Sequence, residues 1–168
     1  GGKVWEYVAA QVGGCITAAL LLRFGATETA VLRNPFVAQG VLSEGVSRNL
    51  AGLGLFEFVT TFCFVYTYCA VCLDGKGPAR QYGPLALGLV YAAGLYCAGP
   101  YTGASMNPAR SLAAALTFWD FTGAWVGMLA VMAGGACGAF AYKSLFRIER
   151  RGRDESAEYV AIGRVVSV

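Results

Sequence analysis

The side chains best suited to chemistry gather in one short stretch, Ala98 to Leu116, which reads AGPYTGASMNPARSLAAAL. Arg110 is the only charged residue between Arg80 and Asp120, and it follows directly on an Asn-Pro-Ala turn. An arginine within an apolar segment is costly unless it meets water or a partner, so its default interpretation is functional. The stretch therefore predicts a site that handles a polar solute.

Catalysis and metal binding are disfavoured by what the rest of the sequence offers. The chain contains no histidine, which excludes Ser-His-Asp and Cys-His nucleophile systems and most zinc or haem sites. Glu57, Asp120 and Arg110 form no recognisable acid/base set. A Cys-x-x-Cys pair could be redox-active, but it lies in an apolar run, so we interpret it as packing. The six cysteines are Cys15, Cys63, Cys69, Cys72, Cys97 and Cys137, and the pair is Cys69 and Cys72. We predict that the protein is not an enzyme and binds neither a cofactor nor a metal.

The composition indicates an all-α membrane protein. Of 168 residues, 57% are hydrophobic and only 14% are charged, which is too little charge for a solvated surface. Four apolar runs each approach the ~20 residues needed to cross a hydrocarbon core. We predict membrane spans at Val4–Leu22, Leu50–Leu73, Pro84–Gly99 and Phe121–Tyr142.

The charge distribution predicts topology and domains. A net charge of +3 indicates no nucleic-acid surface. Basic residues cluster after the last run, which predicts a cytoplasmic C-terminus, on the same side as the loop with Lys76 and Arg80. We expect residues 1–142 to form the membrane domain and residues 143–168 a largely disordered cytoplasmic tail. The cluster consists of Lys143, Arg147, Arg150, Arg151 and Arg153.

The long connection Arg23–Asn49 exceeds ordinary loop lengths, so we expect part of it to pack back onto the membrane domain. Its Asn34-Pro35-Phe36 segment has no apolar helix after it and is most simply a turn.

The stretch around Arg110 predicts a helix too short to cross the membrane. Pro100 lacks an amide proton, so we expect the preceding helix to stop near Gly99 and Tyr101–Met106 to be irregular. Asn107 suits an N-cap and Pro108 a first helical position. The following ten or eleven residues give a helix of ~15 Å, about half a bilayer. We predict a re-entrant half-helix.

Such a half-helix could line a water path. Irregular backbone at membrane depth is tolerated only where it is buried in protein or lines a wet cavity. The positive helix N-terminus, the Asn107 amide and Arg110 would offer donors to a neutral solute and repel cations and protons. The alternative is an interfacial loop from which Arg110 snorkels to the lipid headgroups.

The segment YTGASMNPARS, Tyr101–Ser111, resembles the second signature loop of the aquaporin (major intrinsic protein) family nearly letter for letter. The resemblance covers most of the chain. EYVAAQVGGCITAALLL is similar to the family's third span, LFEFVTTFCFVYTY to its fourth, and Gly123–Tyr142 to its sixth. It implies an aquaporin-like helical bundle, set in membrane lipid and assembled as a homotetramer.

The resemblance also implies roles for individual residues. Asn107, Pro108 and Ala109 match the Asn-Pro-Ala motif at the pore centre, and Arg110 and Ala104 match the outer selectivity constriction. Leu95 falls where strictly water-selective members have histidine, which puts strict water selectivity in doubt.

Other matches bear on the branch of the family and on support of the loop. Ser111 stands where glycerol facilitators carry aspartate, and Ala115 and Trp125 also fit the water-channel branch, whereas Ala124 does not. Glu57 matches a buried glutamate that accepts amides of the re-entrant loop; the alternative is a lipid-facing or protonated acid.

The family fold has six spans and two half-helices in an inverted repeat. This chain supplies four spans and one half-helix, so we expect it to be a fragment of a full-length channel that would not conduct by itself. A half-length protein that assembles with a separate partner is the alternative.

The leading functional prediction for the full-length protein is a passive channel for water, with passage of small neutral solutes because of Leu95. A glycerol, ammonia or peroxide facilitator and a non-conducting membrane scaffold are the alternatives. The sequence does not distinguish the plasma membrane from an internal membrane as the location of the protein.

Overall fold

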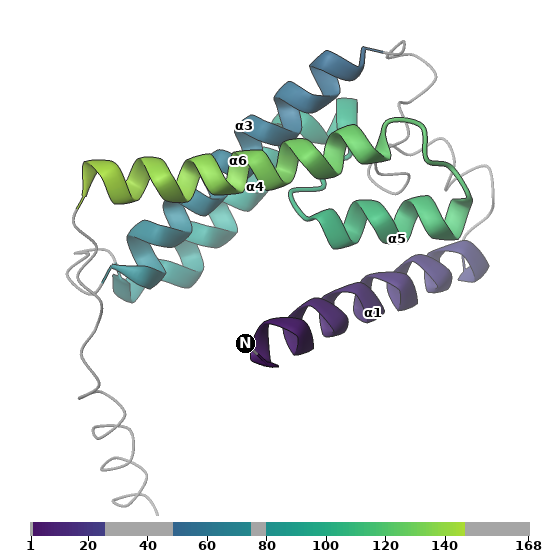
Figure 1. Ribbon diagram of the computed structural model, residues 1–168, viewed down its shortest axis with the longest axis horizontal. Coiled ribbons are helices and arrows are strands. Elements are labelled where there is room, and N and C mark those ends of the chain that lie inside the picture. Colours follow the sequence, from purple (N-terminus) through teal and green to yellow (C-terminus); the bar gives the residue numbers. More distant parts are fainter. Residues whose placement is uncertain (1, 26–48, 75–79, 147–168) are drawn as a thin grey trace, which may run out of the picture.

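The computed structural model describes residues 2–25, 49–74 and 80–146, and every regular element within these ranges is a helix. Figure 1 shows long helices and one short one, α5. The elements are α1 (Gly2–Gly25), α3 (Leu50–Tyr68), the π-helical turn η1 (Cys69–Leu73), the 3-10 turn η2 (Arg80–Tyr82), α4 (Gly83–Thr102), α5 (Pro108–Phe118) and α6 (Ala124–Leu145).

Within the described ranges, four helices are long and apolar enough to cross a membrane, and they coincide with the four predicted runs. These spans cover Lys3–Gly25, Leu50–Leu73, Gly83–Thr102 and Ala124–Leu145. The prediction of an all-α, aquaporin-like membrane fold is confirmed at this level. Three of the four predicted runs begin and end within a few residues of a single helix. The fourth, Leu50–Leu73, covers α3 and η1 together.

The expected break at Pro100 is wrong, because α4 continues through this proline to Thr102. Only one helical hydrogen bond is lost, close to the helix end. Gly99 also lacks the Cβ that would clash with the ring of a following proline. The helix ends instead at Gly103, which adopts a left-handed conformation with φ of 78° and donates its N–H to the Gly99 carbonyl at 2.9 Å. The irregular segment is therefore shorter than predicted.

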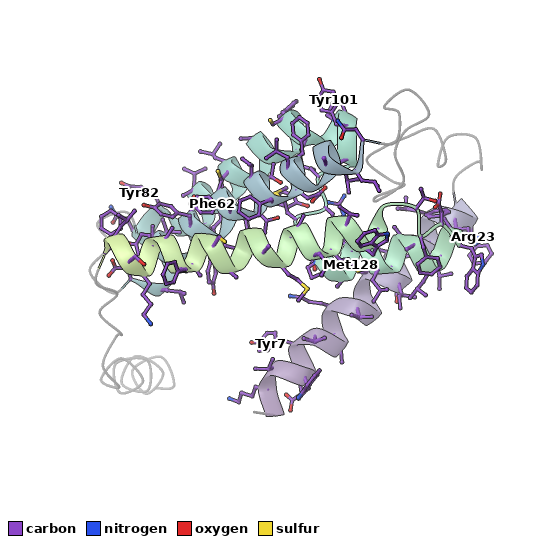
Figure 2. The ribbon with its side chains drawn as sticks, turned by 45° about the horizontal axis from the view of Figure 1, so that its top comes forward. Tyr7, Arg23, Phe62, Tyr82, Tyr101 and Met128 are labelled. Carbon is purple, nitrogen blue, oxygen red and sulfur yellow. The ribbon has the colours of Figure 1, made fainter. Side chains whose placement is uncertain are left out.

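Helix α3 packs against both α4 and α6. Its approach to α6 is close enough to require glycine: a methyl group on Gly134 would lie 2.4 Å from the Phe58 carbonyl oxygen. A methyl group on Gly138 would lie 2.7 Å from the carbonyl oxygen of Phe62, the residue that Figure 2 labels on α3. Small residues four apart thus bring the two backbones together.

Among the described elements, α1 contacts only α5, and the two helices run side by side in Figure 1. Ala19 is the one buried residue described on α1, and Trp5 and Tyr7 project from it. One polar contact joins the pair: Arg23 donates from Nη1 to the Thr117 carbonyl in the last turn of α5. Figure 2 shows Arg23 at the end of α1 that lies beside α5.

Several predictions fall outside the described residues. These are the packing of the connection after α1, the turn at Asn34-Pro35-Phe36, the loop cation Lys76, and the tail with its basic cluster. Of that cluster, Lys143 is described, and it is exposed in the last turn of α6.

Candidate functional site

The short helix α5 begins where the Asn-Pro-Ala turn predicted. Asn107 is extended, with φ of −149°, and its side-chain Oδ1 accepts the Ala109 N–H at 3.0 Å. Its carbonyl accepts the N–H groups of Arg110 and Ser111 at 3.1 and 3.2 Å, while Pro108 fills the first helical position. Two of the amides that a helix start leaves unpaired are thereby satisfied.

The 11 residues of α5 give a length of about 16 Å, half of a hydrocarbon core. The helix ends at Trp119, whose left-handed φ of 56° turns the chain toward α6. Figure 1 shows its N-terminal end turned toward the middle of the molecule and its C-terminal end at the edge. It is therefore a separate short helix and not part of an unbroken long one.

The loop that leads into α5 is strained and is held by one carboxylate. Ala104 and Met106 have positive φ of 45° and 46°, which cost of order 1–3 kcal/mol each in non-glycine residues. Glu57, only 2% exposed, accepts the Ser105 N–H on Oε1 at 2.9 Å and the Met106 N–H on Oε2 at 3.0 Å. The Thr102 hydroxyl adds a third donor to Oε1 at 2.7 Å.

A second polar link joins this loop to α5. The buried Ser111 hydroxyl donates to Ser105 Oγ at 2.7 Å, and Ser105 Oγ donates to the Asn107 carbonyl at 2.8 Å. Ser111 therefore ties the first turn of α5 back to the loop that Glu57 holds. The Ser111 hydroxyl group makes its hydrogen bond within the protein.

The guanidinium of Arg110 points back into the protein. Its Nη1 donates to the Ala104 carbonyl at 3.2 Å and to the Tyr91 hydroxyl at 3.0 Å. Leu95, half-buried on α4, packs against a cluster that includes Ala104. Of the three residues predicted to form the constriction, Arg110 thus contacts Ala104, and Leu95 packs against the cluster to which Ala104 belongs.

Tyr91 was not singled out from the sequence. It precedes Leu95 by four residues, so the two lie on one face of α4. The four-residue spacing from Leu95 was the sequence feature that could have identified Tyr91. Nothing in the sequence indicated that the hydroxyl of Tyr91, rather than water, would meet the arginine.

The sequence model for the family described as Major intrinsic protein matches residues 2–142. The chain belongs to this family. Among its relatives, aquaporin TIP4-1 of Zea mays is 38% identical over 146 residues, which are 86% of this chain and 53% of the relative. Aquaporin TIP2-1 of Arabidopsis thaliana is 37% identical over 142 residues, 83% of this chain and 53% of the relative. Aquaporin NIP1-2 of Oryza sativa subsp. japonica is 37% identical over 154 residues, 90% and 49% respectively.

The chain spans about half the length of these curated relatives. Family membership and the four long apolar helices support an integral, multi-pass membrane protein. The predicted family is confirmed. The roles of the individual site residues stay predictions.

The cysteines that suggested a redox or metal pair lie at the end of the α3 span. Cys69 is buried and Cys72 half-buried, both on the π-helical turn η1, and both are free thiols. Across the described ranges, no three His, Cys, Asp or Glu side chains come together as metal ligands.

Proposed function

We propose that the protein works as a passive transmembrane channel for water that also admits small neutral solutes. The observation that carries the proposal is the short helix α5, which Asn107 caps and which brings Arg110 to the carbonyl of Ala104, a member of the cluster against which Leu95 packs. In a membrane, a half-length helix of this kind presents its positive end to a wet interior rather than to lipid.

The chemistry of passage follows from the donors. Asn107 uses its side-chain oxygen to cap α5, so its NH₂ group is the part that can donate to a passing water molecule. The half charge at the helix N-terminus and the cation of Arg110 oppose entry of cations and protons. No covalent step is needed, so the protein selects by size, hydrogen bonding and charge.

Leu95 widens the expected solute range. An apolar side chain replaces a polar one at that point of the constriction, which lowers the penalty for solutes with apolar surface. This favours a glycerol, ammonia or peroxide facilitator as the second candidate, whereas Ser111 in place of aspartate favours water.

The proposal applies to the complete channel. Because the chain spans about half the length of its relatives, we propose that further spans close the lumen opposite α5, in the same polypeptide or in a partner. A homotetramer in lipid with a cytoplasmic C-terminus is part of the same proposal.

Stopped-flow light scattering on vesicles containing the full-length protein tests the proposal. Water permeability should rise above that of protein-free vesicles, and a glycerol gradient should show slower but measurable entry. A rise for water alone would remove the glycerol facilitator. Well-folded protein that adds no permeability to either would indicate a non-conducting scaffold and refute the channel.

A further inference from the structure

We propose that Tyr91 is a positioning and specificity residue of the constriction, which fixes the guanidinium of Arg110 and supplies the polar wall that Leu95 does not. Its transport readout rests on the proposed channel function. Its structural basis does not, because the contact between the two side chains is present in the structure.

The hydroxyl of Tyr91 and the carbonyl of Ala104 hold one guanidinium nitrogen from two different elements. Nη1 of Arg110 lies 3.0 Å from Tyr91 Oη on α4 and 3.2 Å from the loop oxygen. A flexible arginine side chain is thereby restricted to one position. If the tyrosine hydroxyl were absent, a single weaker contact to the loop would remain of these two.

The ring that carries this hydroxyl is itself fixed. Tyr91 meets Phe64 of α3 edge to face, with ring centroids 6.0 Å apart and planes at 70°. Both rings pack against the buried cluster of Ala98, Ala104 and Met106. The position of the hydroxyl is therefore set by α3 and by the loop as well as by α4, and it cannot follow the arginine if the guanidinium moves.

The chemistry of a phenol suits the second part of the proposal. When Tyr91 accepts a hydrogen bond from Arg110, it keeps its own O–H as a donor and a second lone pair as an acceptor. Leu95 offers neither. The two residues are four apart on α4, so the polar group lies about 6 Å along the helix from the apolar one. A water molecule that finds no hydrogen-bond partner at Leu95 would find one in the hydroxyl group of Tyr91.

The transport test compares matched hydroxyl deletions on one helix. Tyr91→Phe removes the hydroxyl and keeps the ring, whereas Tyr96→Phe makes the same change on a side chain that is 87% exposed. We expect Tyr91→Phe to lower water permeability about fivefold, the equivalent of one net hydrogen bond, and to raise the glycerol-to-water ratio. Tyr96→Phe should leave both values unchanged. Equal effects of the two substitutions would overturn the proposal.

A double-mutant cycle tests whether Tyr91 acts through Arg110. In an Arg110→Val background, we expect Tyr91→Phe to lose most of its effect on the glycerol-to-water ratio. An undiminished effect would refute the positioning role, because the two side chains would then contribute independently.

A measurement that needs no transport keeps the two proposals separate. In ¹⁵N-arginine-labelled protein in bilayers, the Arg110 Nη1 resonance should shift in Tyr91→Phe and remain in place in Tyr96→Phe. An unchanged resonance in Tyr91→Phe overturns the inference even if the channel conducts. If the wild-type protein adds no permeability, the channel proposal fails, and the resonance still decides the role of Tyr91.

Discussion

Replacing Glu57 with glutamine should loosen the loop before α5 without unfolding the helices around it. The carboxylate serves two backbone amides with two different oxygens, Ser105 N–H on Oε1 and Met106 N–H on Oε2. Glutamine has one oxygen and one NH₂ group at these places. Whichever way the amide is turned, one backbone donor faces another donor.

The size of the effect follows from this count. One buried backbone N–H loses its acceptor and one buried NH₂ gains no proper partner, and each such loss costs about 1–3 kcal/mol. The remaining bonds also lose the strength that a charged acceptor gives. A total of about 3 kcal/mol is comparable with the strain of the two left-handed residues, Ala104 and Met106. The loop should therefore open locally, since opening releases that strain.

Hydrogen exchange of the Ser105 and Met106 amides measures this opening. A change of about 3 kcal/mol corresponds to roughly 100-fold faster exchange at these two positions. Amides in the middle of α3 and α6 should exchange as in the wild type. The midpoint of thermal unfolding should fall by less than it would if the same free energy were lost from global unfolding, because the surrounding helices stay folded.

Thr61→Val on the same helix is the matched control. Thr61 is 3% exposed, and its hydroxyl has no hydrogen-bond partner among the described residues, so removing it should leave loop exchange unchanged. Wild-type exchange at Ser105 and Met106 in Glu57→Gln would show that the carboxylate does not hold the loop. So would equal acceleration in both variants, because the effect would then come from disturbing α3 and not from the lost acceptor.

Three further substitutions test other parts of the account. Gly134→Ala should lower the free energy of unfolding by about 1–3 kcal/mol, because the added methyl group meets the backbone carbonyl oxygen of Phe58. Unchanged stability in thermal or detergent unfolding would contradict the close approach of α3 and α6. Arg110→Val should raise the permeability of vesicles to larger neutral and cationic solutes relative to water, and unaltered selectivity would remove Arg110 from the constriction. Tyr142→Phe deprives the buried Asp74 carboxylate of a 2.9 Å hydrogen bond and should cost about 1–3 kcal/mol of unfolding free energy; a neutral result would show that Asp74 is satisfied without it.

Local features of the sequence predicted much of the fold. The long helices follow from apolar runs that lack charge, and the start of α5 follows from an asparagine and a proline at adjacent positions. These signals act over a few residues, so they can be recognised without knowing what lies nearby in space.

Tertiary contacts account for what the sequence did not predict. The helix that was expected to stop near Gly99 runs through Pro100, because the end is set by Gly103 and the loop it opens. The positive φ values of Ala104 and Met106 carry no local signature, since neither residue type favours them. They persist because the carboxylate of Glu57 holds the amides beside them.

Arg110 and Tyr91 are 19 residues apart in the chain, and their contact likewise depends on how α4 and α5 are placed. Composition and spacing identified the arginine as important. They could not identify its partner, because that requires the loop geometry that brings the two side chains together.

The most direct test of the central claim is the environment of the Asn107 side chain in a bilayer. Solid-state NMR with polarisation transfer from water, combined with a paramagnetic probe at the lipid chain ends, reports hydration and depth together. We predict that the Asn107 amide receives polarisation from water while it lies near the middle of the bilayer. An Asn107 amide at headgroup depth, or one at the middle that no water reaches, would contradict it.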